Sequence, residues 1–534
     1  MFATTGCFDL LGLSDFREGE GGGGGTSPTT SSGSTSATAS TSSSSTSAST
    51  GTSSSSGTGG APECTPPMSQ SCYSGAMGTA GVGVCRAGTE ACDASGHFGP
   101  CAGEVVPTVE NCQSDPNESC TPNCGEYVAH HTYASDGEEY FDRIALANNG
   151  DLLILGNAIA GHQLDLGGGA LDVQGDFDVI LARLTPTFGH VWSRTYGFAP
   201  VHSAVSSGLI AIDGFAGTDV TVGGTAFLAG DRLLVRIDAA TGNVLNAGKN
   251  ALSPYATGAS ATGYFEAARS GSNDVLVHRS GLTIDQTLTL WPTSQQVHVT
   301  GIEAFAGGAF VYGDFSGNLT VGGMTVSTSQ SDGFVLKTVN GAATALTQLH
   351  ANGSANVRNA AFVGGDLYVV GSFTGSLPDP LSGQTALSQS GADFYIARLQ
   401  SAGNGLSLTW AKGFPGAGDA VPGPITADTL GFITTSVRVG GDSNFGGGVV
   451  PAVGTNTHVL VSYKSDGTHA WSRPLTVWPS GLVNDAAGRI FVVGGYSPGA
   501  NPDFAGKNFF GSGIDLTGGI AEDAFAAQLF SAAP

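Results

Sequence analysis

Cysteine is the residue type whose placement says most about chemistry in this chain. Eight of the nine cysteines lie between residues 64 and 124, in a stretch with few core-forming side chains. Such a dense set is typical of a small module that is held together by up to four disulfides in an oxidising compartment. Eight cysteines allow roughly a hundred pairings, so the connectivity stays open. The predicted disulfide cysteines are Cys64, Cys72, Cys85, Cys92, Cys101, Cys112, Cys120 and Cys124.

The ninth cysteine, Cys7, has no partner in this count and follows the small residues Thr5 and Gly6. Small residues before a cysteine are part of a lipoprotein signal, whose basic and apolar regions are missing here. We therefore expect the signal to start upstream of Met1, and Cys7 to be the acylated first residue of the mature protein. The alternative is an unpaired cysteine in a flexible tail.

An aspartate recurs four residues before the equivalent of Ala182 in successive repeats of the chain. A ring of carboxylates could bind cations, but side chains of this type also cap backbone N–H groups where a strand begins. Recurrence at equivalent positions in five of the seven repeats favours the structural role, because a ligand site seldom repeats from unit to unit. The predicted turn residues are Asp178, Asp231, Asp332, Asp393 and Asp523.

Other residues offer less chemistry. The Asp-rich loop 172–178 could give oxygens to calcium but lacks the regular spacing of an EF-hand, so no cofactor is predicted and calcium remains an alternative. His130 and His131 cannot chelate together on one strand, because adjacent side chains point to opposite faces. No nucleophile elbow, HExxH or P-loop motif occurs. Three tryptophans lie in equivalent strands, where we expect packing rather than a cofactor platform: Trp192, Trp410 and Trp471.

Short apolar runs between Gly, Asp and Asn clusters predict the strands that carry these residues. From Glu126 onward seven copies of one unit follow each other, the third being short and degenerate. Repeats of about 40–60 residues with four strands each predict an all-β fold, a seven-bladed β-propeller. Tyr127–Ala134 resembles the last strand of the first copy, so we expect it to complete the last blade. The predicted opening strands span 152–161, 209–218, 274–283, 309–317, 367–375, 432–441 and 491–500.

Two parts of the chain resemble known families. Phrases such as DFYIARL and HVWSRTYG are similar to the SBBP propeller repeats of bacterial surface proteins. The cysteine spacing of Cys72–Cys92 and Gly99–Cys112 resembles a module of myxobacterial cell-surface and secreted proteins. There the module commonly runs into an acidic metal-binding motif, which this chain replaces by QSDPNESCTPNC, so the resemblance implies no metal site at that point.

The expected organisation has four parts. Residues 1–18 are the remnant of a lipoprotein signal and the mature N-terminus, and 19–60 form a disordered Gly/Ser/Thr linker with almost nothing apolar to bury. Residues 61–125 form the disulfide-rich module, and 126–534 form the propeller. A net charge of −24 with only 19 basic residues excludes a nucleic-acid partner.

These observations predict a secreted or surface-anchored lipoprotein, extracytoplasmic and attached by its lipid to the outer membrane or cell surface. Its propeller is expected to be a non-catalytic binding or scaffolding domain for an extracellular protein or a glycan. An enzyme acting on glycans or a quinoprotein is the first alternative, since Asp238–Leu245 (DAATGNVL) resembles a quinoprotein repeat phrase. A structural spacer of the cell surface is the second. Fold alone does not decide among them.

Overall fold

The computed structural model describes thirteen stretches of the chain, and within them it is an all-β protein. These are residues 64–74, 85–106, 127–133, 138–159, 163–173, 177–260, 263–389, 391–452, 456–475, 477–496, 503–504, 507–508 and 523–530. The predictions for Cys7 and for the linker 19–60 lie outside them.

The all-β prediction is confirmed: the structure is a seven-bladed propeller of four-stranded antiparallel blades. From the innermost strand outward, blade 1 holds β4 (Glu139–Leu146), β5 (Leu152–Ile159), β8 (Phe177–Leu184) and β9 (His190–Tyr196). Blade 2 holds β10 (Ala199–Val205), β11 (Leu209–Phe215), β14 (Arg232–Asp238) and β15 (Val244–Lys249). Blade 3 holds β16 (Ser253–Ser260), β17 (Gly263–Ser270), β18 (Asn273–Arg279) and β19 (Gln286–Pro292).

The remaining blades repeat this order. Blade 4 holds β20 (Gln296–Phe305), β21 (Gly308–Val321), β22 (Met324–Val339) and β23 (Ala342–Leu349). Blade 5 holds β24 (Asn359–Val363), β25 (Asp366–Phe373), β28 (Asp393–Ala402) and β29 (Gly405–Phe414). Blade 6 holds β30 (Ala420–Ala427), β31 (Phe432–Val439), β34 (Thr457–Lys464) and β35 (His469–Leu475). Blade 7 holds β36 (Trp478–Asn484), β37 (Arg489–Tyr496), β40 (Asp523–Phe530) and β3 (Tyr127–Tyr133).

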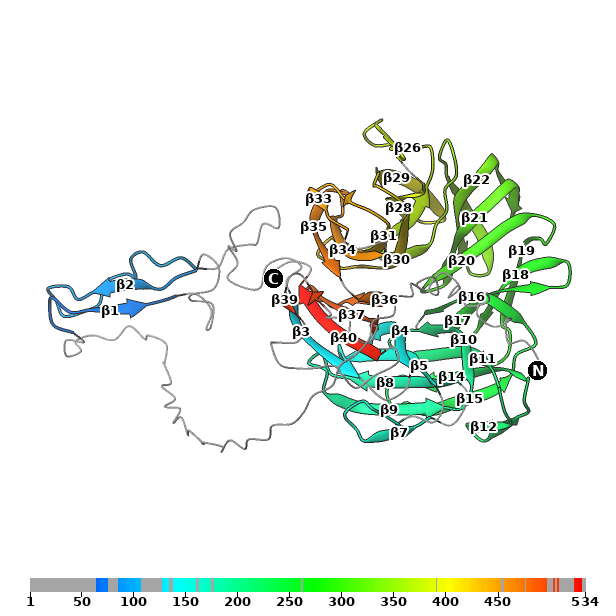
Figure 1. Ribbon diagram of the computed structural model, residues 1–534, viewed down its shortest axis with the longest axis horizontal. Helices are drawn as coiled ribbons and strands as arrows, with labels where there is room; N and C mark the ends of the chain where they lie inside the picture. The colour runs from blue at the N-terminus through cyan, green and yellow to red at the C-terminus, as the bar shows by residue number, and fades with distance from the viewer. Residues whose placement is uncertain are drawn as a thin grey trace, which may run out of the picture. The chain divides into compact units, whose positions relative to one another are not determined.

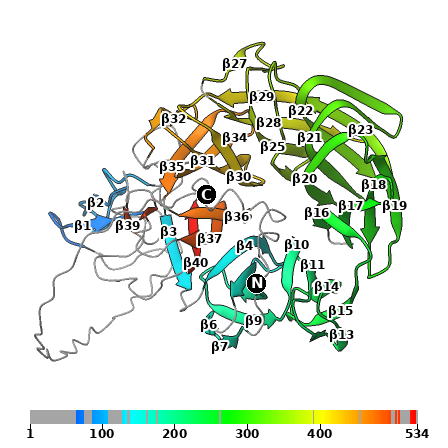
Figure 2. The same ribbon diagram turned by 45° about the vertical axis from the view of Figure 1, so that its right-hand side comes forward.

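The ring closes through β3. This strand comes from the N-terminal end of the propeller and pairs antiparallel with β40, the third strand of blade 7 (Figure 1). The innermost strands contact each other in order around the ring, and β36 packs against β4 (Figure 2). The predicted completion of the last blade by the segment after Glu126 is thus confirmed, and it gives β40 a partner where it would otherwise be an open sheet edge.

The boundaries of the repeat differ from the prediction. Six of the seven predicted opening strands are second strands, and 274–283 falls on the third strand of blade 3. Each blade begins one strand earlier, because its innermost strand carries small and polar residues, as in SPYATGAS of β16, and has no apolar run to mark it. The short Gly-rich segment 163–169 is no blade strand but belongs to a side hairpin.

In four blades a separate side hairpin between the second and third strands contacts the outermost strand of the same blade. The hairpin that follows the second strand of blade 7 instead pairs with β35, the outermost strand of blade 6, through Leu475 and Phe504. Blade 4 makes its hairpin from the long tips of β21 and β22, whereas β17 and β18 of blade 3 are joined by only two residues. The separate hairpins are β6 (Gln163–Asp165) with β7 (Ala170–Asp172), β12 (Val220–Val222) with β13 (Thr225–Phe227), β26 (Ser376–Pro378) with β27 (Thr385–Leu387), β32 (Ser443–Asn444) with β33 (Val449–Val450), and β38 (Asp503–Phe504) with β39 (Lys507–Asn508).

A glycine recurs in the second strand for a steric reason. A Cβ at Gly156 would lie 2.3 Å from the carbonyl oxygen of Tyr140, and one at Gly371 would lie 1.8 Å from that of Asn356. In both blades the innermost strand therefore approaches the second strand too closely for any side chain. One residue further on, the innermost strand has a β-bulge, which bends a strand and redirects its side chains.

The core consists of apolar clusters between neighbouring blades. Six of the seven junctions hold large clusters, such as the one that joins β5 and β8 of blade 1 to β11 and β14 of blade 2. The junction of blades 2 and 3 differs, since its cluster has only three fully buried members, Ala211, Leu234 and Tyr264. Polar side chains fill the rest of that junction.

The chain divides into two compact units, and the smaller comprises Met1–Cys72 with Thr89–Ala102. Among its described residues, β1 (Ser69–Cys72) pairs with β2 (Gly88–Ala91), whose first residue lies just outside the unit. Disulfides join Cys64 to Cys92 and Cys72 to Cys101, and Cys85 is disulfide-bonded as well. The predicted disulfide cysteines Cys112, Cys120 and Cys124 lie outside the described residues.

Candidate functional site

The innermost strands bring polar side chains from different blades to one level of the ring. Six of these strands show a register shift at equivalent positions, between Phe141 and Arg143 in blade 1, for example. In blade 5, Asn359 pairs with Val370 as Arg143 pairs with Leu155, so Arg358 occupies the bulge position there. We call the residues at and beside these bulges the inner wall. It is the candidate site, because concave surfaces with convergent polar groups are where propellers and other folds bind ligands.

Blade 1 contributes a carboxyl and a guanidinium to the inner wall. Asn157 donates to Asp142 at 2.7 Å, and burial raises the pKa of Asp142 to about 7 although Arg143 and Asn157 oppose that shift. Arg143 is exposed, and its side chain forms no hydrogen bond or ion pair with the part of the chain that the structure describes. Because its pKa is raised, the carboxyl of Asp142 offsets the positive charge of Arg143 less than an ordinary aspartate would.

Blade 2 contributes His202, which is half-buried and pairs in register with Asp213. Burial lowers the pKa of His202 to about 4, and the charges of Arg143 and Arg232 act in the same direction. A hydrogen bond to the carbonyl of Pro254 opposes the shift only weakly. His202 is therefore a neutral imidazole near pH 7.

Near the bulge of blade 4 lie Glu303, two residues past Gly301 on the innermost strand, and Tyr312 of the second strand, which pairs with Gly301 and is buried in the apolar cluster shared with blade 5. Burial raises the pKa of Glu303 to about 7, against the lowering effect of the Phe362 N–H, which donates to it at 3.3 Å. The phenol of Tyr312 lies against Gly301, where a Cβ would be 2.4 Å from the hydroxyl oxygen. Burial raises the pKa of Tyr312, Glu303 raises it further and Arg143 lowers it. The charge of Arg143 thus reaches groups on blades 2 and 4, which lie on either side of blade 3.

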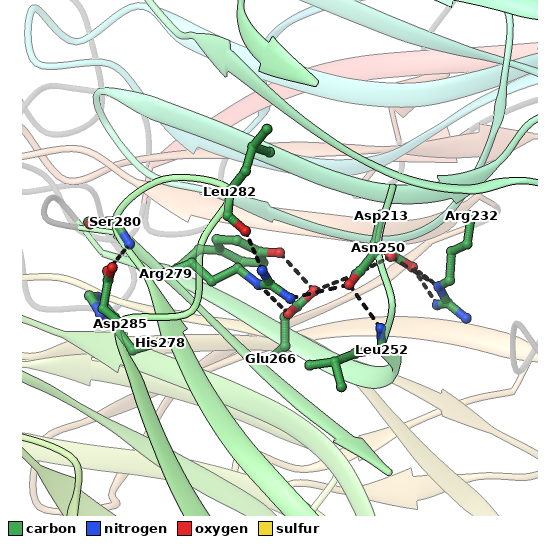
Figure 3. Close-up of polar contacts among 11 residues, drawn as sticks. Asp213, Arg232, Asn250, Leu252, Glu266, His278, Arg279, Ser280, Leu282 and Asp285 are labelled. Atoms are coloured by element: carbon green, nitrogen blue, oxygen red, sulfur yellow. Dashed lines mark hydrogen bonds and ion pairs between the residues drawn. The ribbon is translucent and has the colours of Figure 1, made fainter. Parts of the chain in front are cut away.

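A buried ion network extends from this level into the junction of blades 2 and 3 (Figure 3). Arg232 donates to Asp213 at 2.9 Å, and Arg279 donates to Glu266 at 2.7 Å. Asn250 joins the two pairs, because its amide nitrogen lies 2.7 Å from Asp213 and 2.8 Å from Glu266. Both carboxylate side chains are fully buried. Each anion therefore has a cation and further donors, as buried charges require.

The pKa of Asp213 in this network is raised to about 6, chiefly by burial and also by Glu266. Arg232 and Asn250 hold it down. The guanidinium of Arg232 also lies 3.4 Å from the carbonyl oxygen of Pro254, which accepts a hydrogen bond from His202. The network thus borders the inner wall at His202.

The five repeated aspartates share one position at the start of the third strand. Asp178, Asp332, Asp393 and Asp523 are almost fully buried there, and Asp231 is partly exposed. Asp231 accepts the backbone N–H of Leu228 at 2.9 Å and pairs with Lys249, whereas Asp393 accepts those of Gln389 and Gly416, both at 2.9 Å. Asp332 accepts from His350 at 2.7 Å. The structure does not bring these residues together, and their role as turn residues stays a prediction.

A cation five residues after the repeated aspartate links consecutive blades. Arg183 of blade 1 donates to the carbonyl of Ala240 in a turn of blade 2, and Trp192 donates to the same oxygen at 3.0 Å. Arg398 and Trp410 of blade 5 converge in the same way on Ser465 of blade 6, at 3.5 and 3.2 Å. The turn around Ala240 belongs to the quinoprotein-like segment DAATGNVL. In this structure the carbonyl group of Ala240 accepts hydrogen bonds from Arg183 and Trp192 of the neighbouring blade. The sequence interpretation missed these arginines, although DFYIARL contains one.

The other predicted residues are dispersed. His130 and His131 are consecutive in β3, far along the chain from the inner-wall histidine. Among the residues that the structure describes, no three His, Cys, Asp or Glu side chains gather as a metal site. The loop 172–178 contains undescribed residues 174–176, and calcium binding stays a prediction.

Comparisons with known proteins include two solved structures of low similarity. No protein-family model matches the chain, and no curated protein matches it. The Cps50 (Swd1) β-propeller domain of Myceliophteria thermophila matches with a TM-score of 0.39 at 9% identity, over 68% of this chain and 96% of that one. A protein of unknown function from Dyadobacter fermentans matches with a TM-score of 0.33 at 12% identity, over 76% and 99% of the chains. At these scores neither similarity bears on activity or ligand.

Proposed function

We propose that this chain is a lipid-anchored protein of the extracytoplasmic surface whose propeller binds a ligand without chemical turnover. A propeller in general suits binding or scaffolding, and the disulfides suit an oxidising compartment. Among the described residues, no helix is long and apolar enough to span a membrane. The lipid on Cys7 supplies the attachment in this proposal.

The observation that carries the binding role is the inner wall. Arg143, His202 and Tyr312 come from three blades, are close enough for Arg143 to alter the pKa of the other two, and take no part in the inter-blade links of Arg183 or Arg398. The repeated aspartates are spread over separate blades instead of meeting at one point. This distribution supports a binder over an enzyme, which would gather its acids and bases around one reacting atom.

Thermal unfolding of the full chain, followed by tryptophan fluorescence, tests the binding role. All five tryptophans lie in the propeller, so the signal reports that unit. Divalent cations, a quinone cofactor and neutral and acidic glycans are added one class at a time. A ligand at a hundred times its Kd stabilises the folded state by about 2.7 kcal/mol, which raises the midpoint. Self-association without any shift would favour the structural spacer instead.

The lipid anchor has its own test. We expect wild-type protein in its natural host to sediment with membranes and Cys7→Ser to be released to the soluble fraction. Mass spectrometry of the peptide that begins at Cys7 should show the acyl chains. An unmodified Cys7 peptide, or membrane attachment that survives Cys7→Ser, would contradict the anchor while leaving the binding role intact.

A further inference from the structure

We propose that the ring of the propeller opens and closes reversibly at the junction of blades 2 and 3, which acts as a hinge. We call this junction the polar seam; in it β11 and β14 of blade 2 face β17 and β18 of blade 3. The proposal does not depend on the ligand-binding role. It follows from the small apolar cluster of the polar seam, from the way its charges are paired, and from the link that its outer side lacks.

The apolar cluster of the polar seam is the smallest of the seven. Its three buried members are Ala211, Leu234 and Tyr264, whereas the clusters of the other junctions have twelve to seventeen buried members each. The free energy that holds apolar elements together grows with the apolar area removed from water. Separating blades 2 and 3 therefore breaks up less clustered apolar packing than separating any other pair of neighbouring blades.

Each ion pair of the buried network lies within one blade. Asp213 pairs with Arg232 in blade 2, and Glu266 pairs with Arg279 in blade 3 (Figure 3). Asn250 joins the two blades, because its amide nitrogen donates to Asp213 at 2.7 Å and to Glu266 at 2.8 Å, and its oxygen accepts from Arg279 at 3.2 Å. Opening the polar seam therefore breaks the bonds of one amide and keeps both ion pairs. Water then solvates the exposed charges, which offsets the bonds that are lost.

The outer side of the polar seam lacks the link that joins other blades. In blades 1 and 5 an arginine and a tryptophan, paired in register, donate to one carbonyl of the following blade. The same paired positions of blade 2 hold Arg236 and Asn246. The buried Arg236 Nε and Asn246 Oδ1 have no hydrogen-bond partner among the described residues. In the equivalent turn of blade 3, the carbonyl of Leu282 accepts from Arg279 of the same blade instead.

The inner side of the polar seam stays joined. Thr257 of blade 3 donates to the carbonyl of Ser203 in blade 2 at 3.0 Å, so the two innermost strands are bonded to each other. Residues 250–252 also connect the blades covalently. These connections place the hinge at the innermost strands, and the missing outer link places the opening at the outer side.

Hydroxyl-radical labelling of the full chain, read by mass spectrometry, tests the hinge with two buried tyrosines. Tyr264 is 1% exposed in the polar seam, and Tyr395 is fully buried in the cluster between blades 4 and 5. We expect Tyr264 to be labelled about tenfold faster or more, because local opening exposes the least stable contacts first. Equal labelling of the two tyrosines would overturn the proposal.

A matched pair of variants tests the role of the bridging amide. Asn250→Leu removes the bonds between the blades, so we expect it to raise the labelling of Tyr264 several-fold and to leave that of Tyr395 unchanged. Asn246→Leu is the control and should change neither, since the Asn246 side chain bonds to none of the described residues. Unchanged labelling of Tyr264 in Asn250→Leu, or an equal rise at both tyrosines, would contradict the hinge. If Asn250→Leu fails to fold, the comparison of the two tyrosines in the wild type still decides.

Discussion

Single side chains decide how closely the strands of a blade can approach. Gly371 faces the carbonyl of Asn356, and a methyl group there would have to push away the segment that leads into β24, the innermost strand of blade 5. The same segment continues through Arg358 to Asn359, the first residue of β24, at the inner wall. The glycine thus supports the geometry of the candidate site as well as the packing of its blade.

We expect Gly371→Ala to lower the free energy of unfolding by about 1–3 kcal/mol, because overpacking forces backbone shifts. The control is Gly208→Ala, since a Cβ at Gly208 meets nothing within 4 Å. Denaturant unfolding followed by fluorescence measures both variants. Equal stability of the two would show that the innermost strand of blade 5 moves without cost.

Buried histidines make the fold sensitive to acid. Burial, followed by the charge of Arg438, lowers the pKa of His458 to about 4 from its ordinary value near 6.5. A histidine with a lowered folded-state pKa stabilises the fold fully above pH 6.5, and this contribution is lost as the pH falls toward 4. We expect wild-type protein to lose more stability between pH 6.5 and 4.5 than His458→Gln does. The measurement is the thermal unfolding midpoint of each protein at a series of pH values. Equal decreases of the midpoint in the two proteins between pH 6.5 and 4.5 would refute this prediction.

At the level of elements, the junction of blades 2 and 3 differs from the other six. It replaces apolar packing by the network of Glu266, Arg279, Asn250, Asp213 and Arg232 (Figure 3). Removing one partner of a buried ion pair leaves the other unpaired at a cost of about 3–5 kcal/mol, whereas replacing both by apolar residues is often neutral. A single substitution in this network should therefore cost more stability than a double substitution that replaces both partners, which is not expected of ordinary apolar packing.

We expect Glu266→Met to destabilise the propeller by about 3–5 kcal/mol and the double variant Glu266→Met with Arg279→Met by clearly less. Denaturant unfolding of both gives the comparison, and Arg269→Met is a control, since Arg269 is largely exposed and 3.5 Å from Asp274. A double variant less stable than the single one would mean that the pair contributes through its shape and not its charge.

The strand β3 is the element that closes the ring. Deleting residues 127–133 would leave β40 without its outer partner, so we expect a lower unfolding midpoint and concentration-dependent aggregation through the exposed edge. Deleting seven residues from the linker 19–60 is the control for chain length. Light scattering and thermal unfolding measure the two effects, and an unchanged midpoint would mean that the ring holds without this closure.

For the whole molecule, the sequence predicted the fold and the closure, because second and third strands carry unbroken apolar runs such as LLIL and VILA. It misplaced blade 3, because β17 carries Glu266 and Arg269 and so resembles a loop. It also missed Arg143, since an isolated arginine on a strand has no spacing that distinguishes it from a solvated one. That Arg143 has no ion-pair partner among the described residues, and that its charge acts on His202 and Tyr312, depends on three blades meeting around one axis, which no local pattern encodes.

The distribution of cysteines and tryptophans separates the N-terminal cysteine-containing segment from the propeller experimentally. Every cysteine lies at or before Cys124 and every tryptophan lies after it, so reduction acts on that segment and fluorescence reports the propeller. The propeller gains its cohesion from inter-blade clusters and from β3 instead of from disulfides. We therefore expect a reducing agent that exposes free thiols to leave the fluorescence-detected unfolding midpoint unchanged. A lowered midpoint would mean that the disulfide-bonded segment stabilises the propeller, and the segment and the propeller would then have to be treated as one cooperative structure.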